Sequence, residues 1–441
     1  MSFTAQQLAQ YVDGELHGDS SVLCCGAEID TRRSLLGKIF FALQGENTDG
    51  HEYVEEAVLG GCSAVVVEKH FNLPVPVVIV EDAREALFKL AKARREEITF
   101  DSVIAVTGSV GKTTTKDILS TLLGKGAVVS RKSFNNDLGV PLTILDAEQA
   151  NYLVSEIGAN ALGEIEPLAN LVNPDIAILT SVEKAHLEGF GTIEIVLKEK
   201  SKLLSSVHEG GYVIVPDTID VSAFSFMGKV IKVGKSDSAD IKILTGLSED
   251  GFATLEMEGR RVSLSLLGEH NAMNAALAIV ASSFAMREKS IWDLLELASK
   301  VCSPEGRLRK IEAGGVTFID DSYNANPASM RAALKLFSTF NAPRKILVLG
   351  DMLELGETSK EEHRSLGPVI EQVGVDLVVL VGSGMGSVVG DFSAIRIPDA
   401  TNLDKVTSLL QQDDLVLLKG SRDLRLERII GFYQQTKVLE H

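Results

Sequence analysis

The sequence has 441 residues, which is too many for a single hydrophobic core, so we expect two to four domains. Hydrophobic residues make up 45% and charged residues 24%, a balance typical of soluble globular proteins. The formal net charge of -18 argues against non-specific nucleic-acid binding, although it still permits a local site for an anionic substrate.

Neither the start of the sequence nor its most apolar stretch predicts export or membrane insertion. The segment MSFTAQQLAQYVDGEL has no basic region ahead of an apolar one, unlike a signal peptide. The longest uncharged stretch, residues 271–286, is shorter than the roughly 20 residues of a spanning helix, so it predicts a buried helix. The four cysteines lack metal-ligand spacing. We therefore expect a reduced, cytoplasmic protein without membrane insertion.

Residues 1 to about 98 alternate short helical and strand patterns. We expect helices over residues 4–11 and 83–97, and strands over residues 39–43, 64–67 and 75–80. This alternation predicts a first α/β domain.

A polar stretch, Asp30-Thr31-Arg32-Arg33, interrupts these elements. Its plain interpretation is a turn with a solvated basic pair, and the residues by themselves do not decide between this and a binding role.

The next stretch, residues 103–122, organises the rest of the chain. An apolar run, residues 103–106, enters a loop and a helical pattern follows from Thr115. Such a strand, loop and helix can hold phosphates with backbone N–H groups and a helix N-terminus. Lys112 adds a charge for the outer phosphates, and Thr113 offers a hydroxyl to Mg²⁺. The loop residues are Gly108, Ser109, Val110, Gly111, Lys112, Thr113 and Thr114. The spacing GxxGKT predicts ATP or GTP binding, and the alternative is an ordinary strand-to-helix turn.

Further along, an apolar strand over residues 152–156 ends in Glu156. A carboxylate in this place beside a phosphate-binding loop predicts a second magnesium ligand, although a surface acid is the alternative. A strand over residues 176–179 leads to His186. From residue 212 to 267 the apolar spacing shortens toward period two, which predicts antiparallel strands.

Residues 314–441 alternate more regularly. We expect strands over residues 316–319, 346–349, 377–381 and 415–418 and helices near 328–340, 360–373, 402–411 and 424–433. This order predicts a parallel sheet covered by helices on both faces. The polar clusters that follow the strands, at residues 320–327, 350–351 and 419–422, lie where such sheets bind ligands.

One lysine falls on the wrong face of a predicted helix. Between residues 193 and 207 the apolar residues occupy one arc, and Lys200 falls near its middle, whereas Lys198 and Lys202 fall opposite. A lysine there is either a snorkelling side chain or a functional group facing a site. If it loses its proton, its amine can add carbon dioxide and become an anionic carbamate that holds a metal.

The sequence resembles the Mur ligase family, the ATP-dependent amide ligases of peptidoglycan precursor synthesis. The resemblance spans nearly the whole chain and rests on these motifs: DTRRSLLGKIFFALQGENTDGHEYVEEAVLGGCSAVVV, VTGSVGKTTTKD, NNDLGVPLTIL, EIGANALGEI, AHLEGFG, GEHNAMNAALA, DDSYNANPASMRAAL, GDMLELGE and LLKGSR. The chain departs from the family pattern at Asp137, Ser181 and Lys202, where Glu, Asn and Glu are usual.

The resemblance implies an α/β protein of three domains: residues 1–98 would bind the UDP-substrate, residues 99–313 would form a P-loop domain with a mainly parallel sheet that binds ATP, and residues 314–441 would form a Rossmann-like domain. Thr113 and Glu156 would hold one Mg²⁺, and His186 with carbamylated Lys200 would hold a second. Lys112, His186 and Lys200 would be catalytic. Further roles are implied for Asn274 (adenine), Arg307 (phosphates), Asp321 (ribose), Asn135, Asn136 and Asn326 (peptide), and Thr31 and Arg32 (the uridine nucleotide).

The implied reaction joins D-alanyl-D-alanine to UDP-N-acetylmuramoyl-tripeptide through an acyl phosphate, in a monomer. Arg422, at a strand end, is a candidate for binding the dipeptide carboxylate, because a guanidinium suits bidentate capture. Two other functions stay open: another ligase of this fold, such as a folylpolyglutamate synthetase-like enzyme, and a P-loop switch ATPase without ligase activity.

Overall fold

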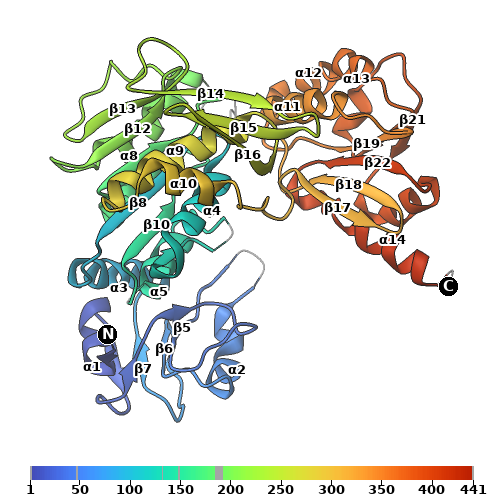
Figure 1. Ribbon diagram of the computed structural model, residues 1–441. Helices are drawn as coiled ribbons and strands as arrows, with labels where there is room; N and C mark the ends of the chain where they lie inside the picture. The colour runs from blue at the N-terminus through green and yellow to red at the C-terminus, as the bar shows by residue number, and fades with distance from the viewer. Residues whose placement is uncertain (1, 46–47, 132, 148, 184–191, 440–441) are drawn as a thin grey trace.

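The computed structural model describes the chain except residues 1, 46–47, 132, 148, 184–191 and 440–441. Three sheet-based domains follow one another along the chain (Figure 1). The second domain lies between the other two, which are attached to different sides of it (Figure 1). No helix in the described part of the chain is both long enough and apolar enough to cross a membrane.

The first domain is built on one five-stranded sheet. Its elements are β1 (Phe3–Thr4), α1 (Ala5–Val12), β2 (Glu15–His17), β3 (Leu23–Cys24), β4 (Ala27–Glu28), β5 (Ile39–Phe41), α2 (Val54–Leu59), β6 (Ala64–Val67), β7 (Val77–Ile79) and α3 (Ala83–Glu97). The sheet order is β2-β7-β6-β5-β4, and only β2 is antiparallel to its neighbour. Alternate residues enter opposite cores: Ile39 and Phe41 pack on the side of α1 and α3, and Phe40 packs on the side of α2.

The second domain contains a nine-stranded sheet. Its elements are β8 (Ser102–Thr107), α4 (Lys112–Leu123), β9 (Ala127–Val129), α5 (Gly139–Asp146), β10 (Tyr152–Glu156), α6 (Ile165–Val172), β11 (Ile176–Leu179), α8 (Ile193–Ser205), β12 (Tyr212–Pro216), β13 (Lys229–Gly234), β14 (Ile241–Leu247), β15 (Phe252–Met257), β16 (Arg260–Leu267), α9 (His270–Ala285) and α10 (Ile291–Ala298). The order is β16-β15-β14-β13-β12-β11-β8-β10-β9, with β8 and its apolar run third from the β9 edge and between two parallel neighbours.

The expectation of antiparallel strands from residue 212 to 267 is wrong for the first half of that range. β12 and β13 pair in parallel with their neighbours, and only β14, β15 and β16 pair antiparallel with one another. The physical reason is burial: β12 is covered along almost its whole length, as parallel strands are, whereas β16 alternates exposed and buried residues over part of its length.

The third domain has a six-stranded sheet in the order β17-β18-β22-β19-β20-β21. Its elements are β17 (Arg309–Ala313), β18 (Val316–Asp321), α11 (Pro327–Ser338), β19 (Arg344–Gly350), α12 (Ser359–Arg364), α13 (Gly367–Val373), β20 (Leu377–Val381), β21 (Ala394–Ile397), β22 (Asp414–Lys419) and α14 (Arg428–Leu439). All pairs are parallel except β17 with β18. β17 therefore forms a hairpin with the third domain's first parallel strand.

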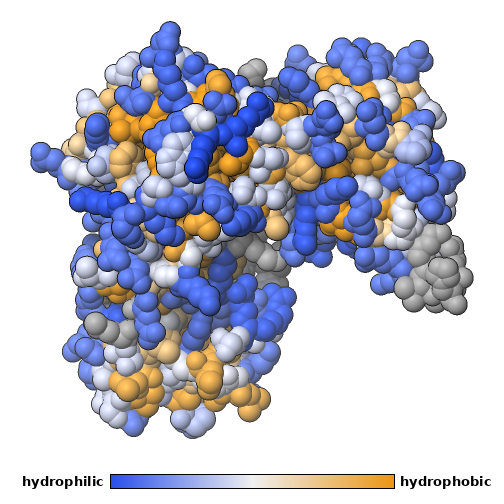
Figure 2. All heavy atoms as spheres, viewed as in Figure 1, coloured by the Kyte–Doolittle hydropathy of each residue, from blue (hydrophilic) through white to orange (hydrophobic). Residues whose placement is uncertain are grey.

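Each outer domain contacts the second domain differently. α3 packs along α5, and Arg95 of α3 donates to the carbonyls of Val172 and Asn173 at the end of α6. The third domain instead packs its α11 against the far end of β15 and β16, where Phe252 and Leu267 join its core. Figure 2 shows the surface deeply hollowed between the first and third domains. The active-site residues below lie on the second and third domains.

Candidate active site

The phosphate-binding loop connects β8 to α4. α4 begins at Lys112, earlier than the helical pattern predicts, and Gly111 precedes it with φ of 86°. A Cβ on Gly111 would lie 2.5 Å from Asn274 Oδ1, and a Cβ on Gly108 would lie 2.0 Å from Thr180 Oγ1. Both glycines are therefore required by close packing, and the loop leaves the N–H groups of the first turn of α4 free for a phosphate.

Lys112 lies against this loop. Its Nζ donates to the carbonyl of Gly108 at 2.7 Å and approaches that of Ser109 at 3.4 Å. Burial lowers the pKa of Lys112, the charge of Arg307 acts in the same direction, and Glu156 opposes both. A cation that is poorly solvated gains most from an incoming phosphate.

Glu156 lies at the centre of a hydrogen-bond network beside the loop. The side chain is 1% exposed, so the alternative of a surface acid is wrong. Its Oε2 accepts from Thr113 Oγ1 at 2.9 Å, and its Oε1 accepts from Asn135 Nδ2 at 2.9 Å. Arg307, which comes from the segment that leads into the third domain, donates to Thr113 Oγ1 at 3.0 Å.

This donor set fits magnesium. Mg²⁺ prefers hard oxygen ligands, and it is commonly held by one or two carboxylates with waters and substrate phosphates. Thr113 and Glu156 supply a hydroxyl and a carboxylate at the start of α4 and the end of β10. Among the described residues there is no cluster of three or more His, Cys, Asp and Glu side chains. His186 lies outside the described residues.

Lys200 is buried in α8, as the helical pattern predicts, with 2% exposure, so the snorkelling alternative is wrong. Burial and then the charge of Lys112 lower the pKa of Lys200 to about 7, against a smaller opposing effect of Glu199. The charge of Lys112 acts on the Lys200 amine, so the two ammonium groups lie within electrostatic reach of each other. Near neutral pH much of this amine carries no proton.

A cavity of about 580 Å³ lies between the second and third domains and is lined by residues of both. The predicted site residues among those lining it are Ser109, Val110, Gly111, Lys112, Thr113, Thr114, Asn135, Asn136, Glu156, Asn274, Arg307, Asp321 and Asn326. The volume is typical of a pocket for a nucleotide-sized ligand.

Three of these side chains are already engaged within the protein. Asp321 accepts from the backbone N–H of Leu308 and from Lys419 Nζ at 2.6 Å. Asn326 caps α11 through its side-chain oxygen, and Asn274 donates to Asn271. Their binding roles therefore remain predictions.

The described residues that line this cavity do not include Gly108, Lys200, Thr31, Arg32 or Arg422. Arg32 is largely exposed and pairs with Asp30 in the loop that follows β4, beside Thr31. Arg422 pairs with Glu427 at 3.0 Å and lies 5.8 Å from the ring centroid of Tyr323.

Tyr323 itself is a cavity residue that the pattern analysis missed, as are His270 and Lys419. Arg307 lies over the ring of Tyr323 at 4.2 Å. The signal was present for Tyr323 and Lys419, since both fall in the polar clusters at the ends of β18 and β22, whereas His270 is the first residue of α9, whose pattern is mainly apolar.

Fold and site together define an α/β enzyme whose phosphate-binding loop faces the third domain across a cavity. Residues 106–282 match the Mur ligase middle domain, and residues 306–422 match the glutamate ligase domain of Mur ligases. The chain belongs to the Mur ligase family.

Similar proteins cover the chain almost completely. A UDP-N-acetylmuramoyl-tripeptide–D-alanyl-D-alanine ligase of Haemophilus influenzae is 34% identical over 96% of both chains. The crystal structure of MurF from Acinetobacter baumannii has a TM-score of 0.84 at 31% identity over 99% of both chains. MurF ligase from Thermotoga maritima in complex with ADP has a TM-score of 0.79 at 27% identity, covering 95% of this chain and 99% of that one. The prediction of a three-domain α/β ligase is confirmed.

Proposed function

We propose that this chain is the ATP-dependent ligase that joins D-alanyl-D-alanine to UDP-N-acetylmuramoyl-tripeptide and forms the UDP-muramyl-pentapeptide. The observation that carries the proposal is the cavity where the phosphate loop, Glu156 and Arg307 meet the polar loops of the third domain. The near-complete match to ligases of that name supports the choice of substrates. We propose that the enzyme works as a monomer in the cytoplasm.

The first chemical step transfers the γ-phosphoryl group of ATP to the peptide carboxylate and gives an acyl phosphate. The phosphate loop holds the β- and γ-phosphates, and Lys112 neutralises charge as it moves onto the leaving ADP. Arg307 reaches the same region through Thr113. Bound magnesium supplies further neutralisation of phosphate charge. Asn274 and Asp321 would hold the adenine and the ribose.

Two sets of residues would hold the ions. Thr113 and Glu156 would bind the first Mg²⁺, and His186 with a carbamate on Lys200 would bind the second. The buried Lys200 amine, with its pKa of about 7, fits carbamate formation because only the unprotonated amine adds carbon dioxide.

The second step is attack of the dipeptide amine on the acyl phosphate carbon. The tetrahedral intermediate then loses a proton from its nitrogen, which the departing phosphate can accept, and the C–O bond to phosphate breaks to leave the amide. Asn135, Asn136 and Asn326 would align the peptide, and Arg422 would bind the D-alanyl-D-alanine carboxylate. Thr31 and Arg32 would hold the uridine nucleotide at the far end. Because water competes for the acyl phosphate, closure of the third domain onto the second is part of this proposal.

An ADP-release assay tests the proposal directly. With purified protein and Mg²⁺·ATP, we expect rapid ADP release only when UDP-N-acetylmuramoyl-tripeptide and D-alanyl-D-alanine are both present, with one amide formed per ADP. Release with a folate and glutamate instead would indicate a folylpolyglutamate synthetase-like enzyme. Slow release that is indifferent to both substrates would indicate a switch ATPase.

The phosphate-loop lysine provides the matched mutational test. Lys112→Ala should leave the thermal transition unchanged within a few degrees and lower the ligation rate by at least about a hundredfold, because one positioned charge contributes several kcal/mol at the transition state. Lys125→Ala, an exposed lysine beyond the same helix, should retain full activity. Retained ADP release coupled to amide formation in Lys112→Ala would contradict the assignment.

A further inference from the structure

Segment 130–137 connects β9 to α5 and is described except at residue 132. Several of its inner contacts concern the proposed magnesium site. Ser130 Oγ accepts from the backbone N–H of Glu156 at 2.9 Å, and Asn135 Nδ2 donates to the carboxylate of the same residue at 2.9 Å. Ser133 Oγ lies 3.4 Å from Thr113 Oγ1. The segment thus fixes both the backbone and the side chain of Glu156 through hydrogen bonds.

The outer contacts of the same segment include three that reach the first domain, and Arg131 also pairs with Asp146 of α5 within the second domain. Arg131 Nη1 donates to Glu28 Oε2 at 2.7 Å. The guanidinium of Arg33 lies 5.7 Å from the ring centroid of Phe134. Asp137 pairs with Arg84 at 2.5 Å. Residues that contact the proposed magnesium site therefore alternate along the segment with residues that contact the first domain.

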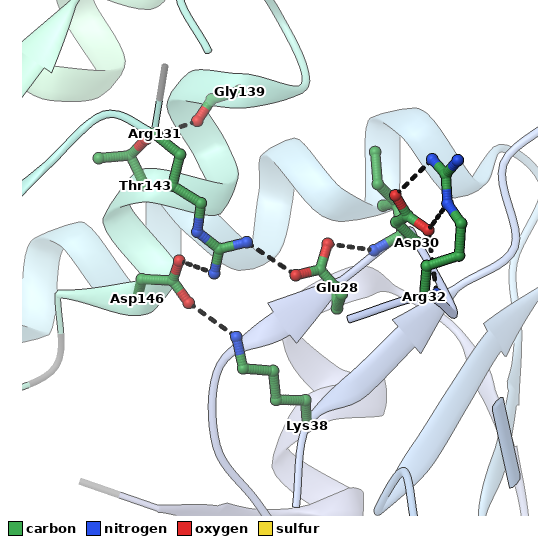
Figure 3. Close-up of polar contacts among 9 residues, drawn as sticks. Glu28, Asp30, Arg32, Lys38, Arg131, Gly139, Thr143 and Asp146 are labelled. Carbon is green, nitrogen blue, oxygen red and sulfur yellow. Dashed lines mark hydrogen bonds and ion pairs between the residues drawn. The ribbon is translucent and has the colours of Figure 1, made fainter. Parts of the chain in front are cut away.

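Of these outer contacts, the one made by Arg131 is the strongest physically. The side chain of Glu28 is 1% exposed. Because an unpaired buried carboxylate destabilises the folded state strongly, breaking the Arg131–Glu28 ion pair is unfavourable. Figure 3 shows Arg131 between Glu28 of β4 and Asp146 of α5, and Asp146 also accepts from Lys38 at 3.0 Å. The Arg84–Asp137 pair is about half exposed on each side, where ion pairs contribute little.

β4 leads directly into the loop that carries Asp30 and Arg32, the pair at the right of Figure 3. The partner of Arg131 therefore ends the strand from which the proposed uridine-nucleotide loop begins. One guanidinium thus connects this strand to the segment that holds Glu156.

We propose that Arg131 is a positioning residue: it fixes segment 130–137 to β4 and thereby makes the placement of Glu156 depend on the first domain. This inference rests on the proposed function for its magnesium site. It assigns to Arg131 no contact with a reacting atom. Its effect passes through Asn135, which donates to the Glu156 carboxylate, and through Ser130, which accepts from the Glu156 backbone N–H. Groups that orient a metal ligand in this way change metal affinity about 10- to 100-fold when they are removed.

The matched variants are Arg131→Met and Lys38→Met. Both remove a cation from the same interdomain network, but only Arg131 belongs to the segment. We expect Arg131→Met to weaken Mg²⁺-dependent ADP binding, measured by calorimetry over a Mg²⁺ series, by about tenfold. Lys38→Met should change it less than about twofold. Equal effects of the two variants would mean that the network only joins the domains, and would overturn the proposal.

A double-mutant cycle tests the route. Because Arg131 acts through Asn135, the effects of Arg131→Met and Asn135→Ala on Mg²⁺ affinity should be strongly non-additive, whereas Lys38→Met and Asn135→Ala should add. Glu28→Gln, in the other domain, should weaken Mg²⁺ affinity in the same direction as Arg131→Met. Additive effects of Arg131→Met and Asn135→Ala, or an unchanged affinity in Glu28→Gln, would overturn the proposal.

These binding measurements do not need ligation, so they separate the inference from the proposed function. If no substrate gives an amide but the variants still change Mg²⁺ affinity as expected, only the proposed function is refuted. If Arg131→Met does not fold, Arg131→Lys provides the reading, since a lysine ammonium can reach one of the two carboxylates and should restore part of the affinity. Wild-type Mg²⁺ affinity in the double variant Arg131→Lys/Glu28→Gln, in which no ion pair to β4 remains, would overturn the proposal.

Discussion

At the scale of single residues, Lys200 has the most unusual environment in the proposed site. An ordinary lysine is almost fully protonated at neutral pH, whereas burial brings the pKa of this one to about 7. The unprotonated amine is the form that adds carbon dioxide. We therefore expect ¹³C-bicarbonate to label one carbamate carbon in the protein, detected by NMR, and Lys200→Ala to lack this signal.

The same carbamate predicts chemical rescue. Lys200→Ala should lose at least about 90% of its ligation rate, since it removes a ligand of the proposed second ion. A short carboxylic acid in the assay buffer should restore a substantial part of the rate. Lys198→Ala, at an exposed position of the same helix, should need no rescue. Full activity of Lys200→Ala without any acid, in bicarbonate-free buffer, would exclude the carbamate.

Lys200 also predicts a pH-dependent stability. Its folded-state pKa of about 7 lies below the ordinary 10.5, so between these values the unfolded chain holds a proton that the folded chain has lost. Stability therefore rises with pH across this window, and the full cost of burying the ammonium is present below pH 7. In bicarbonate-free buffer, Lys200→Met should raise the free energy of unfolding by about 4 kcal/mol at pH 6 and by almost nothing at pH 10. Urea unfolding at both pH values measures this, and a gain that does not change with pH would contradict it.

The neighbouring departure from the family pattern has a structural explanation. Lys202 turns away from Lys200 and pairs with Glu199 at 2.8 Å. Glu199, which is 1% exposed, accepts from the backbone N–H groups of Gly163 and Ile165 at the start of α6. The lysine that replaces the usual glutamate at position 202 is therefore paired with a carboxylate of the same helix, Glu199, and not directed at the Lys200 amine.

At the scale of elements, the two glycines that flank α4 differ in how closely they are packed. Gly111 and Gly124 flank the same helix, and both have positive φ, at 86° and 74°. A Cβ on Gly111 would meet Asn274, whereas nothing lies within 4 Å of one on Gly124. The pair therefore separates backbone strain from steric overlap.

We expect Gly124→Ala to cost about 1–2 kcal/mol of unfolding free energy from backbone strain alone. Gly111→Ala should cost more and should also weaken Mg²⁺·ADP binding at least about tenfold, because the loop must move away from Asn274. Thermal unfolding and calorimetry measure the two effects. Equal unfolding free energies of the two variants would contradict this, because the overlap with Asn274 would then be relieved without any loss of stability.

Elements with strong apolar runs were predictable from their pattern. The strands over residues 64–67, 152–156, 176–179 and 377–381, and the helix over residues 83–97, have the predicted bounds. β21 was not predicted: it has only four residues, three of which are exposed. The helix predicted over residues 360–373 is divided into α12 and α13 ahead of Pro368, and residues 400–409 form a 3₁₀ helix instead of an α-helix.

At the scale of the whole molecule, the phosphate loop, Glu156 and Lys200 could be predicted because each lies within one local pattern. The partners that join them could not. Arg307 reaches Thr113 from 194 residues away, and Arg131 reaches Glu28 from 103 residues away. The spacing of apolar residues along the sequence does not predict such pairs, because they depend on how the domains pack against each other.

The placement of the domains predicts a measurable compaction. The third domain contacts the second through α11 and the Arg307 segment, and the cavity lies between the two. A nonhydrolysable ATP analogue with Mg²⁺ should draw the domains together and lower the radius of gyration toward the roughly 22 Å of a compact chain of this length. Small-angle scattering of the wild type, with Lys112→Ala as the control that binds the analogue poorly, checks this. An unchanged radius at saturating analogue would contradict it.

The hydrogen bonds of Glu156 have a consequence for the order in which ligands arrive. Both of its oxygens already accept from protein donors, Thr113 and Asn135, so a free magnesium ion gains little by displacing them. An ion that brings phosphate oxygens with it gains much more. Metal and nucleotide should therefore enter as one complex, and the rate should follow the concentration of Mg²⁺·ATP instead of free Mg²⁺. The folded chain without nucleotide should be indifferent to chelators, so its thermal transition should not move when EDTA is added.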